Sequence, residues 1–394
     1  MQEKIKERAR MLHPTVVEWR RHLHAHPELS YQEMETAAFV QARLKEMGIR
    51  FQVMSSTGVI GLIEGKDPGS RTVALRADMD ALPILEENDV PYQSKHAGVM
   101  HACGHDVHTA CLLGAAQILQ ETKEHWSGTV KLIFQPGEEK NPGGASLLIK
   151  EGVLENPKPQ AIVALHVNTL LEAGEVSFRS GKVMASADEL YFTIKGKGGH
   201  AASPHLAVDP ILISAHLITA LQQLISRHNQ PFNPTVLSIT SIQGGTTTNV
   251  IPEQVKLMGT FRAMDEQWRF EAHEKIQKLS TELVRSMGGE LDLHIDVGYP
   301  CVHNHERVNE SCRRLAVTYL GNDHVSETEL RMGAEDFGYY AQKIPGCFFR
   351  LGTRNEKEGI IHGVHTPRFN IDESAMETGV GLMAWLGATL EPVQ

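Results

Sequence analysis

The sequence predicts an α/β protein: a catalytic domain built on a mostly parallel sheet with helices on both faces, plus an inserted ferredoxin-like α+β satellite domain. Three observations predict it. In the first half of the chain, continuous apolar runs typical of buried strands alternate with helical patterns. Between residues 184 and 298 the order becomes β-α-β-β-α-β. After residue 299 the first pattern resumes, so we expect a discontinuous catalytic domain of residues 1–183 and 299–394 around the insertion.

Three predicted strands of the first half end in acidic or metal-binding side chains. The strands are the apolar runs at 71–83, 128–139 and 161–168. Their terminal residues are, in order, Asp78 and Asp80, Glu138 and Glu139, and His166. Open α/β sheets bind ligands beyond the carboxyl ends of their strands, so we expect these side chains to share one crevice.

A fourth element adds to this crevice. The stretch MHACGHDVH, residues 100–108, leads into a predicted helix with apolar residues at helical spacing over 106–121. Cys103 and His105 then lie at or just before the helix N-terminus, where the helix dipole favours an anionic thiolate.

The inserted domain has the order strand, helix, strand, strand, helix, strand. These elements are predicted at 188–196, 208–228, 235–243, 253–263, 266–287 and 290–299. Beyond it, a helix at 310–321, a strand at 346–353 and a last helix at 374–390 return to the α/β pattern.

Composition and charge exclude several classes of partner. The chain has 38 Lys and Arg against 48 Asp and Glu, a net charge of -10, and no basic run suited to a phosphate backbone, so we expect no nucleic-acid partner. Five cysteines without regular spacing favour a reducing compartment over a disulfide framework. No signal peptide or long apolar stretch is evident, so we predict a cytoplasmic protein without membrane contact.

The residues themselves leave several interpretations of the site open. A structural zinc site at Cys103 and His105 would need a second Cys or His pair at comparable spacing, and none follows. A cysteine nucleophile is disfavoured because two residues so close on one turn seldom reach base-to-thiol geometry. Adjacent carboxylates such as Glu138 and Glu139 are usually solvated, but at a strand end one could bind metal while the other moves protons.

Several histidines are ambiguous on the residues alone. His166 could be an ordinary strand-end residue, and spacing does not choose between His362 and His365 as a ligand. His200 and His205 lie in a glycine-rich stretch that is usually only a turn.

Taken in order, these segments resemble the M20 metallopeptidase family, and in particular its amidohydrolase branch of aminoacylases, hippurate hydrolases and plant auxin-conjugate hydrolases. The resemblance covers essentially the whole chain, and many motifs in the correct order are more specific than any one of them. The matching motifs are RRHLHAHPELSYQE, LRADMDALP, MHACGHDVH, FQPGEE, LHV, KGKGGHAASPH, GGTTTNVIPE, GTFR, MGAEDFGYY and HTPRFNIDE.

The resemblance implies a two-metal centre. Five positions match the family's metal ligands: Cys103, His105, Glu139, His166 and His365. Glu138 matches the catalytic carboxylate, and Asp80 matches the acid that orients a ligand. His365 is preferred over His362 because it stands directly before a Thr-Pro-x-aromatic segment, as in the branch. Asp78 stands where the wider family usually has His, a substitution characteristic of the Cys-containing branch.

The resemblance also assigns roles in the inserted domain. His200 matches a histidine that reaches a partner subunit's active site, which implies a homodimer or higher oligomer through this domain. Asn249 and Arg262 match positions that hold the substrate carboxylate, for which the Arg fork is suited. After His166 the sequence reads VNTLLEAG where branch members often have Pro, which bears on substrate preference.

The implied activity is hydrolysis of N-acyl amino acids by water activated on two divalent metal ions. The ligand set suits zinc, with manganese, cobalt or nickel as alternatives. A dipeptidase or carboxypeptidase with the same centre is the alternative enzyme, and a catalytically silent metal-binding scaffold is the alternative outside enzymology. His101 and His108 are expected to have supporting roles, and Asp106 has no assigned role.

Overall fold

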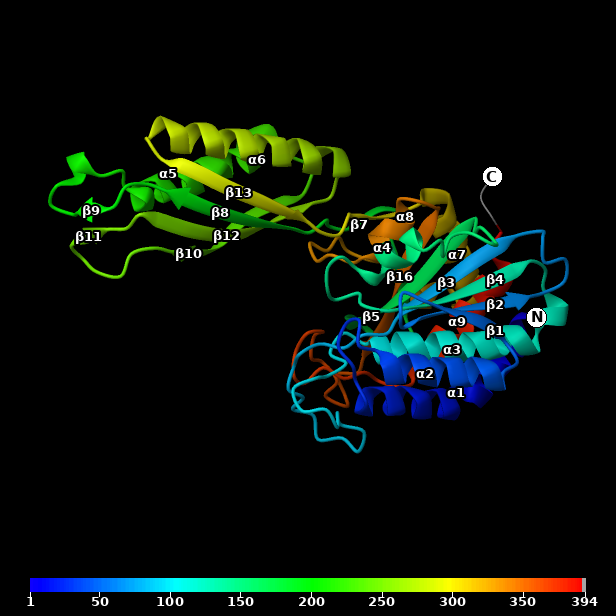
Figure 1. The fold of residues 1–394 in the computed structure, drawn as a ribbon. Coiled ribbons are helices and arrows are strands. Elements are labelled where there is room, and N and C mark those ends of the chain that lie inside the picture. The colour runs from blue at the N-terminus through cyan, green and yellow to red at the C-terminus, as the bar shows by residue number, and fades with distance from the viewer. Residues whose placement is uncertain (392–394) are drawn as a thin grey trace. The chain divides into compact units, whose positions relative to one another are not determined.

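The computed structural model describes residues 1–391, which form two compact units (Figure 1). The large unit contains Met1–Gly181, His303–Glu329 and the described residues from Asp336 onward; the small unit contains Lys182–Val302 and Leu330–Glu335. The segment Leu330–Glu335 corrects the predicted boundaries, which placed it in the catalytic domain. It joins the small unit because the Ala185 N–H donates to the carbonyl oxygens of Arg331 and Gly333.

The large unit is built on an eight-stranded, mostly parallel sheet, which confirms the predicted fold class. Its four central strands run parallel, and β3 and β4 are buried at every position, as their continuous apolar runs predicted. In spatial order the strands are β1 (Arg50–Met54), β2 (Gly58–Glu64), β4 (Thr129–Gln135), β3 (Thr72–Asp78), β5 (Ala161–Glu172), β16 (Gly346–Arg354), β6 (Val176–Phe178) and β15 (Val325–Glu327).

Helices cover both faces of this sheet. In Figure 1, α1, α2 and α3 lie on one side, and α4 and α8 lie on the other. Helix α3 packs against α1, α9 and β3 and is buried almost all round, which explains its apolar composition. The helices are α1 (Gln2–Ala25), α2 (Met34–Glu46), α3 (His105–Glu121), α4 (Gly144–Lys150), α7 (Glu306–Leu320), α8 (Phe337–Ala341) and α9 (Ala375–Thr389), with short turns η1 (Lys123–His125) and η4 (Asn322–His324).

The small unit has the predicted ferredoxin-like arrangement. Its sheet has the order β10-β12-β8-β13 with antiparallel neighbours, and both helices pack on one face (Figure 1). Asp209 and Asp265 accept hydrogen bonds from the first N–H groups of the two helices and so fix where they begin. The elements are β8 (Asp188–Lys195), α5 (Pro210–Gln223), β10 (Thr235–Gln243), β12 (Gln254–Ala263), α6 (Glu266–Ser286) and β13 (Glu290–Val297).

Shorter elements complete the description. β9 (Gly199–His200) pairs with β11 (Val250–Ile251), and the connecting segments β7 (Gly181–Met184) and β14 (Val302–Asn304) pair with each other. Two turns, η2 (Pro204–Leu206) and η3 (Leu224–His228), flank α5. All five cysteines are free and buried. Within residues 1–391, no helix has the length and apolar character needed to cross a membrane.

Candidate metal centre

The predicted ligands of the large unit gather where β3, β4 and β5 end and α3 begins. Helix α3 starts after Gly104, whose φ of 85° is left-handed, and a Cβ there would lie 2.6 Å from Val167. This turn brings the Cys103 thiol to 3.4 Å from Nε2 of His166 on β5. The thiol is buried, and burial with the charge of Glu139 raises the pKa of Cys103, so a stable thiolate here requires a nearby cation.

The two buried histidines present their Nε2 atoms to the same space. His105 donates from Nδ1 to the carbonyl oxygen of Asp80 at 2.8 Å, and His166 donates from Nδ1 to the carbonyl oxygen of Val167 at 2.8 Å. These bonds fix the tautomer that leaves the Nε2 lone pair for a metal. Nε2 of His105 is buried without a hydrogen-bond partner in the described chain.

Asp80 holds both acidic residues of the next loop through their backbones. Its carboxylate accepts the N–H of Glu138 and the N–H of Glu139, each at 3.0 Å. Burial alone would raise the pKa of Asp80, but hydrogen bonds from His105 and Ser30 hold it below its usual value. The charged carboxylate therefore serves as a fixed anchor for this loop.

The side chains of Glu138 and Glu139 both approach His105. Glu138 Oε2 and Glu139 Oε1 each lie 3.9 Å from Nε2 of His105. Glu139 Oε1 is buried and also lies 3.2 Å from Nε2 of His365, with which it forms an ion pair. An acceptor oxygen buried in this way fits a metal ligand.

His365 completes the group from a distant loop. Its φ is 62°, and its N–H donates to the carbonyl oxygen of Ala102 at 2.7 Å, which ties it to the start of α3. The adjacent Cys103 and Glu139 raise the pKa of His365 to about 10, which reflects the anionic character of the pocket. Both candidate histidines are exposed, but His365 joins the donor cluster and His362 belongs to none of the donor groups found in the described chain.

These side chains fit a pair of metal ions. In each of three groups, the donor atoms all lie within 4.8 Å of one another, and the groups overlap through shared residues. The groups are Cys103 with His105 and His166, Cys103 with Glu139 and His365, and His105 with Glu138 and Glu139. One thiol, three imidazoles and two carboxylates are donors that transition-metal ions prefer.

A neighbouring donor group consists of Asp78, His105 and His108, but hydrogen bonds already use the side-chain atoms of Asp78 and His108. Asp78 accepts from Arg76 Nη1 and from His108 Nδ1, both at 2.6 Å. His108 Nε2 accepts the N–H of Val167 at 3.0 Å. Asp78 and His108 therefore support the site through hydrogen bonds, and the sequence interpretation missed the buried Arg76.

Asp106 and His101 lie behind the ligands rather than among them. Asp106 is buried and accepts from Arg20 Nε and His24 Nδ1, both at 2.8 Å. Burial alone would raise the pKa of Asp106, but Arg20 and His24 hold it far below its usual range. Burial lowers the pKa of His101 to about 4. Arg20 and His24 were missed because nothing near them in the sequence identifies their partner.

The predicted site residues of the small unit, which are the catalytic His200 and the substrate-binding Asn249 and Arg262, do not gather in one place. The β9–β11 pairing brings His200 next to Asn249, whose carbonyl oxygen accepts the N–H of Ala201, and both side chains are exposed. Figure 1 shows β9 and β11 beyond the ends of β8 and β12. Arg262 lies near the other end of β12, roughly 25 Å along the strand from Gln254. One chain therefore does not bring all three residues to one ligand.

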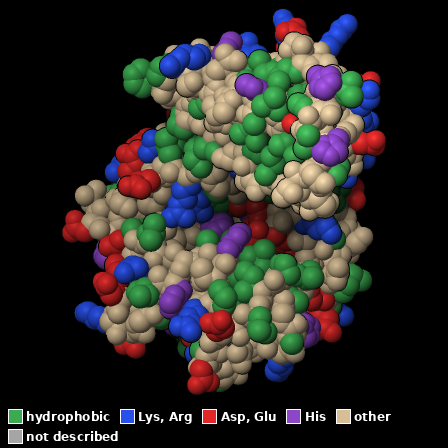
Figure 2. Space-filling model, turned by 90° about the vertical axis from the view of Figure 1, so that its left-hand side faces the viewer, with side chains coloured by type: hydrophobic (Ala, Val, Ile, Leu, Met, Phe, Trp, Pro, Cys, Tyr) green, Lys and Arg blue, Asp and Glu red, His purple; other side chains and the backbone are tan. Residues whose placement is uncertain are grey.

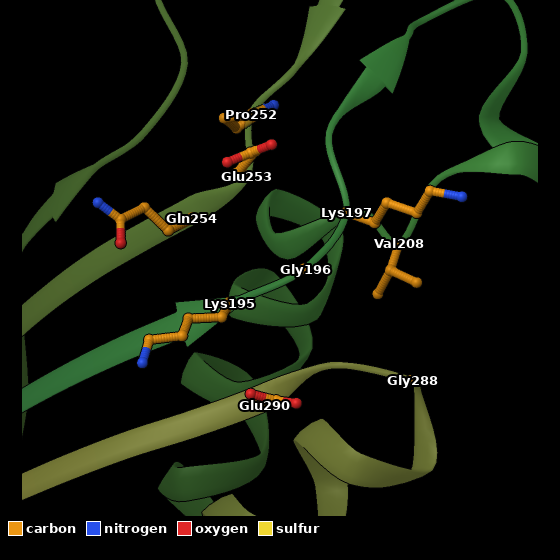
Figure 3. A pocket seen from close by; sticks show the side chains of 9 residues that line it. All are labelled: Lys195, Gly196, Lys197, Val208, Pro252, Glu253, Gln254, Gly288 and Glu290. Atoms are coloured by element: carbon orange, nitrogen blue, oxygen red, sulfur yellow. The ribbon is translucent and has the colours of Figure 1, made fainter.

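An open groove of about 640 Å³ also lies in the small unit, at the ends of β8, β12 and β13 (Figure 3). Its charged side chains point away from one another, and no predicted site residue lines it. The groove therefore adds nothing to the predicted site.

Comparison with known proteins identifies the family to which the chain belongs. The model of "Peptidase family M20/M25/M40" matches residues 74–386. The chain belongs to this family. Among M20 relatives, it is 39% identical over 382 residues to "Thermostable carboxypeptidase 2" of Saccharolobus solfataricus, covering 96% of this chain and 95% of the relative. It is also 39% identical over 358 residues to "N-acetyl-L-cysteine deacetylase" of Bacillus subtilis, covering 91% and 83%.

A solved M20 structure supports the cofactor prediction. A dinuclear metal-binding peptidase from Bacillus subtilis superposes with a TM-score of 0.84 at 34% identity, covering 98% of this chain and all of that one. Family membership and the donor cluster together confirm the prediction of a metal-dependent M20 hydrolase with two divalent metal ions.

Proposed function

We propose that this M20 hydrolase cleaves the amide bond of N-acyl amino acids to a carboxylic acid and a free amino acid. The observation that carries the proposal is the position of the Glu138 carboxylate, which is buried beside His105 and Glu139. Its backbone is anchored by Asp80. Glu138 is therefore placed to move protons next to side chains that hold metal.

On the strength of the donor cluster and the family resemblance, we assign the metal ligands as Cys103, His105, Glu139, His166 and His365. Two divalent ions bound there would supply Lewis acidity and lower the pKa of a water toward neutrality. The thiolate and imidazole donors suit zinc, and manganese, cobalt and nickel are alternatives.

Glu138 acts first as a general base and then as a general acid. Its carboxylate accepts a proton from water as the water oxygen bonds to the amide carbonyl carbon. The same carboxyl returns this proton to the nitrogen as the C–N bond breaks, so that the amine leaves neutral. Asp80 keeps the backbone of Glu138 in one place through both transfers.

A homodimer through the small unit completes the proposal. Edge strand β13 carries the charged residues Glu290, Asp292 and Asp296, which discourage pairing, whereas edge strand β10 carries no charge. Exposed apolar side chains lie near β10 and α5: Leu206, Ile211, Leu212, Ile242 and Val250. Figure 2 shows hydrophobic and histidine side chains together on the face of the small unit that carries β9 and β11.

A dimer would also explain the separation of the substrate residues. If His200 serves the metal centre of the partner chain, it stabilises the developing oxyanion there. Asn249 and Arg262 then hold the substrate carboxylate from different chains, with Arg262 supplying a bidentate contact. The distance along β12 supports this arrangement because one chain does not bring the two together.

The two candidate activities, hydrolysis of N-acyl amino acids and hydrolysis of peptides, differ in the acyl group that is attached to the amide nitrogen. The relatives include a protein named as a deacetylase and one named as a carboxypeptidase, so both substrate classes are reasonable for this centre. A panel of N-acetyl and N-benzoyl amino acids against dipeptides, with each candidate metal restored, decides between them. Faster hydrolysis of dipeptides would favour the peptidase, and no hydrolysis of any compound would favour a silent scaffold. A cytoplasmic location stays a prediction from cysteine usage.

The test of the catalytic assignment is Glu138→Gln. The amide cannot accept the proton of water, so turnover should fall by on the order of a thousandfold. Elemental analysis should show that the Glu138→Gln variant has the same metal content as the unsubstituted protein, because the assigned ligands are intact. Turnover within tenfold of the unsubstituted protein would contradict the proposal.

A further inference from the structure

The loop that carries Glu138 and Glu139, residues 136–144, is bounded by glycines. Gly137 has a φ of 56° and Gly143 a φ of 83°, both in the left-handed region. Glycine has more backbone freedom than any other residue, so rotation at Gly137 would swing the Glu138 carboxylate away from its target. Something must hold the loop for the carboxylate to keep one position.

Glu33 holds the loop at its first glycine. Its side chain is fully buried, and Oε1 accepts the N–H of Gly137 and the N–H of Tyr31, each at 2.8 Å. Oε2 accepts the hydroxyl of Thr57 at 2.9 Å. The carboxylate is thereby fixed from two other directions, so its bond to Gly137 acts as a rigid tether.

Tyr31 holds the other end. Its hydroxyl donates to the carbonyl oxygen of Lys140 at 2.6 Å and accepts the N–H of Gly143 at 3.0 Å. The ring packs over Gly137, where a Cβ would lie 2.2 Å from the ring edge. Tyr31 thus contacts the loop before and after the two acidic residues.

The same short segment reaches the anchor inside the loop. The hydroxyl of Ser30 donates to Oδ2 of Asp80 at 2.6 Å, and Asp80 in turn accepts the N–H groups of Glu138 and Glu139. The segment of residues 30–33, Ser-Tyr-Gln-Glu, therefore contacts both the loop, through Tyr31 and Glu33, and Asp80, which anchors the loop, through Ser30.

We propose that Tyr31 and Glu33 are positioning residues that fix the backbone on both sides of Glu138 and so aim its carboxylate during proton transfer. This inference rests on the proposed role of Glu138. An error of about 1 Å in the position of a catalytic group can lower the rate on the order of a hundredfold. Neither side chain joins any donor group found in the described chain, so their effect should fall on turnover rather than on metal content.

Tyr31→Phe is the sharpest test, because it removes only the hydroxyl and keeps the ring over Gly137. We expect kcat to fall 10- to 100-fold, KM to stay within about twofold, and the metal content to be unchanged. Glu33→Ala should have a similar effect. Glu33→Gln should restore most of the turnover, because its amide oxygen can accept from Gly137 while its NH2 donates to the Thr57 hydroxyl.

Thr122→Val is the matched control, since it removes the hydrogen bond of a buried hydroxyl to the carbonyl oxygen of Ile118 at the C-terminal end of α3, away from the loop. We expect this variant to lose thermal stability while kcat stays within twofold. If Tyr31→Phe also keeps kcat within twofold, or loses metal in proportion to activity, the positioning role is overturned. Glu138→Gln separates the two proposals: if it keeps turnover, the proposed function fails, and if it is inactive while Tyr31→Phe is fully active, only this inference fails.

Discussion

The candidate metal centre and the predicted site residues of the small unit are built in opposite ways. In the centre, Cys103, His105 and His166 are buried, and hydrogen bonds through the far side of each ring fix the two imidazoles. In the small unit, His200 and Asn249 are exposed and lie at the opposite end of the sheet from Arg262.

The difference separates two kinds of preorganisation. Electrostatic chemistry at a metal requires ligands and base fixed before substrate arrives, and one chain supplies all of the residues that we propose for these roles. The residues that we propose for binding a substrate carboxylate, Asn249 and Arg262, are not brought together by one chain, which is understandable if a second copy supplies part of the site.

The largest effect should come from the metal centre itself. His365→Gln removes one imidazole donor, so metal affinity and turnover should both fall, with turnover reduced on the order of a thousandfold. His362→Gln is the matched control three residues earlier and should leave both unchanged. Metal titration with activity assays checks this, and equal losses in the two variants would show that the assignment of His365 is wrong.

The next effect concerns the uncharged edge strand. Ile242→Lys places a charge on β10, where two copies would bring like charges together, so the dimer dissociation constant should rise 10- to 100-fold. Val297→Lys puts the same charge on β13, an exposed apolar position at the other edge, and should leave assembly unchanged. Sedimentation over a range of concentrations measures both. A shift with Val297→Lys alone would place the interface on β13 instead.

A smaller effect is expected from mixed dimers. Glu138→Gln and His200→Ala should each abolish activity as homodimers. If His200 acts across the interface, a heterodimer purified with two different tags contains one site with both an intact Glu138 and an intact His200, so it should recover about half the turnover per dimer. If His200 instead serves its own chain, each site of this heterodimer lacks one group and the turnover should be near zero. The inactivity of the His200→Ala homodimer is measured first, because an active homodimer would make the comparison meaningless.

A second mixture makes this outcome decisive. A heterodimer of the unsubstituted chain with a chain carrying both substitutions has one intact site if His200 acts within its own chain. If His200 acts across the interface, each of its two sites lacks one group, and the turnover should be near zero. Comparing the two heterodimers therefore distinguishes the arrangements directly.

The sequence predicted those parts of the site that are marked by local patterns. His166 and Glu139 follow apolar strands, and Cys103 and His105 precede an apolar helix, so their shared location followed from the topology of open sheets. The choice of His365 over His362 came from family resemblance alone. The hairpin of β1 and β2 was not foreseen, because β1 is largely exposed and has no apolar run.

The missed residues act through partners far away in the chain. Arg20 pairs with Asp106, and Glu33 with Gly137, across intervals in which no local spacing connects them. Hydrophobic periodicity reports which face of an element is buried, but it does not report which buried charge meets which. Only the folded chain shows these pairs.

The smallest predicted effect tests the support behind the metal centre. Asp106 is charged and paired with Arg20 in the folded chain, and this pairing holds the pKa of Asp106 far below its unfolded value. A carboxyl with a depressed folded pKa stabilises the fold above its unfolded pKa of about 4, and the contribution is lost as pH falls below that value. Asp106→Asn leaves Arg20 without this counter-ion and should lower the free energy of unfolding by about 3 kcal/mol at pH 7. The deficit should shrink below about pH 4, where the unsubstituted chain loses the same contribution. Urea unfolding between pH 7 and pH 3, after metal is removed with a chelator, measures this difference in the free energy of unfolding. Asp67→Asn, at an exposed position, is the control for an equal change of charge. A deficit that is constant across this pH range would show that the pairing contributes through packing and not through charge.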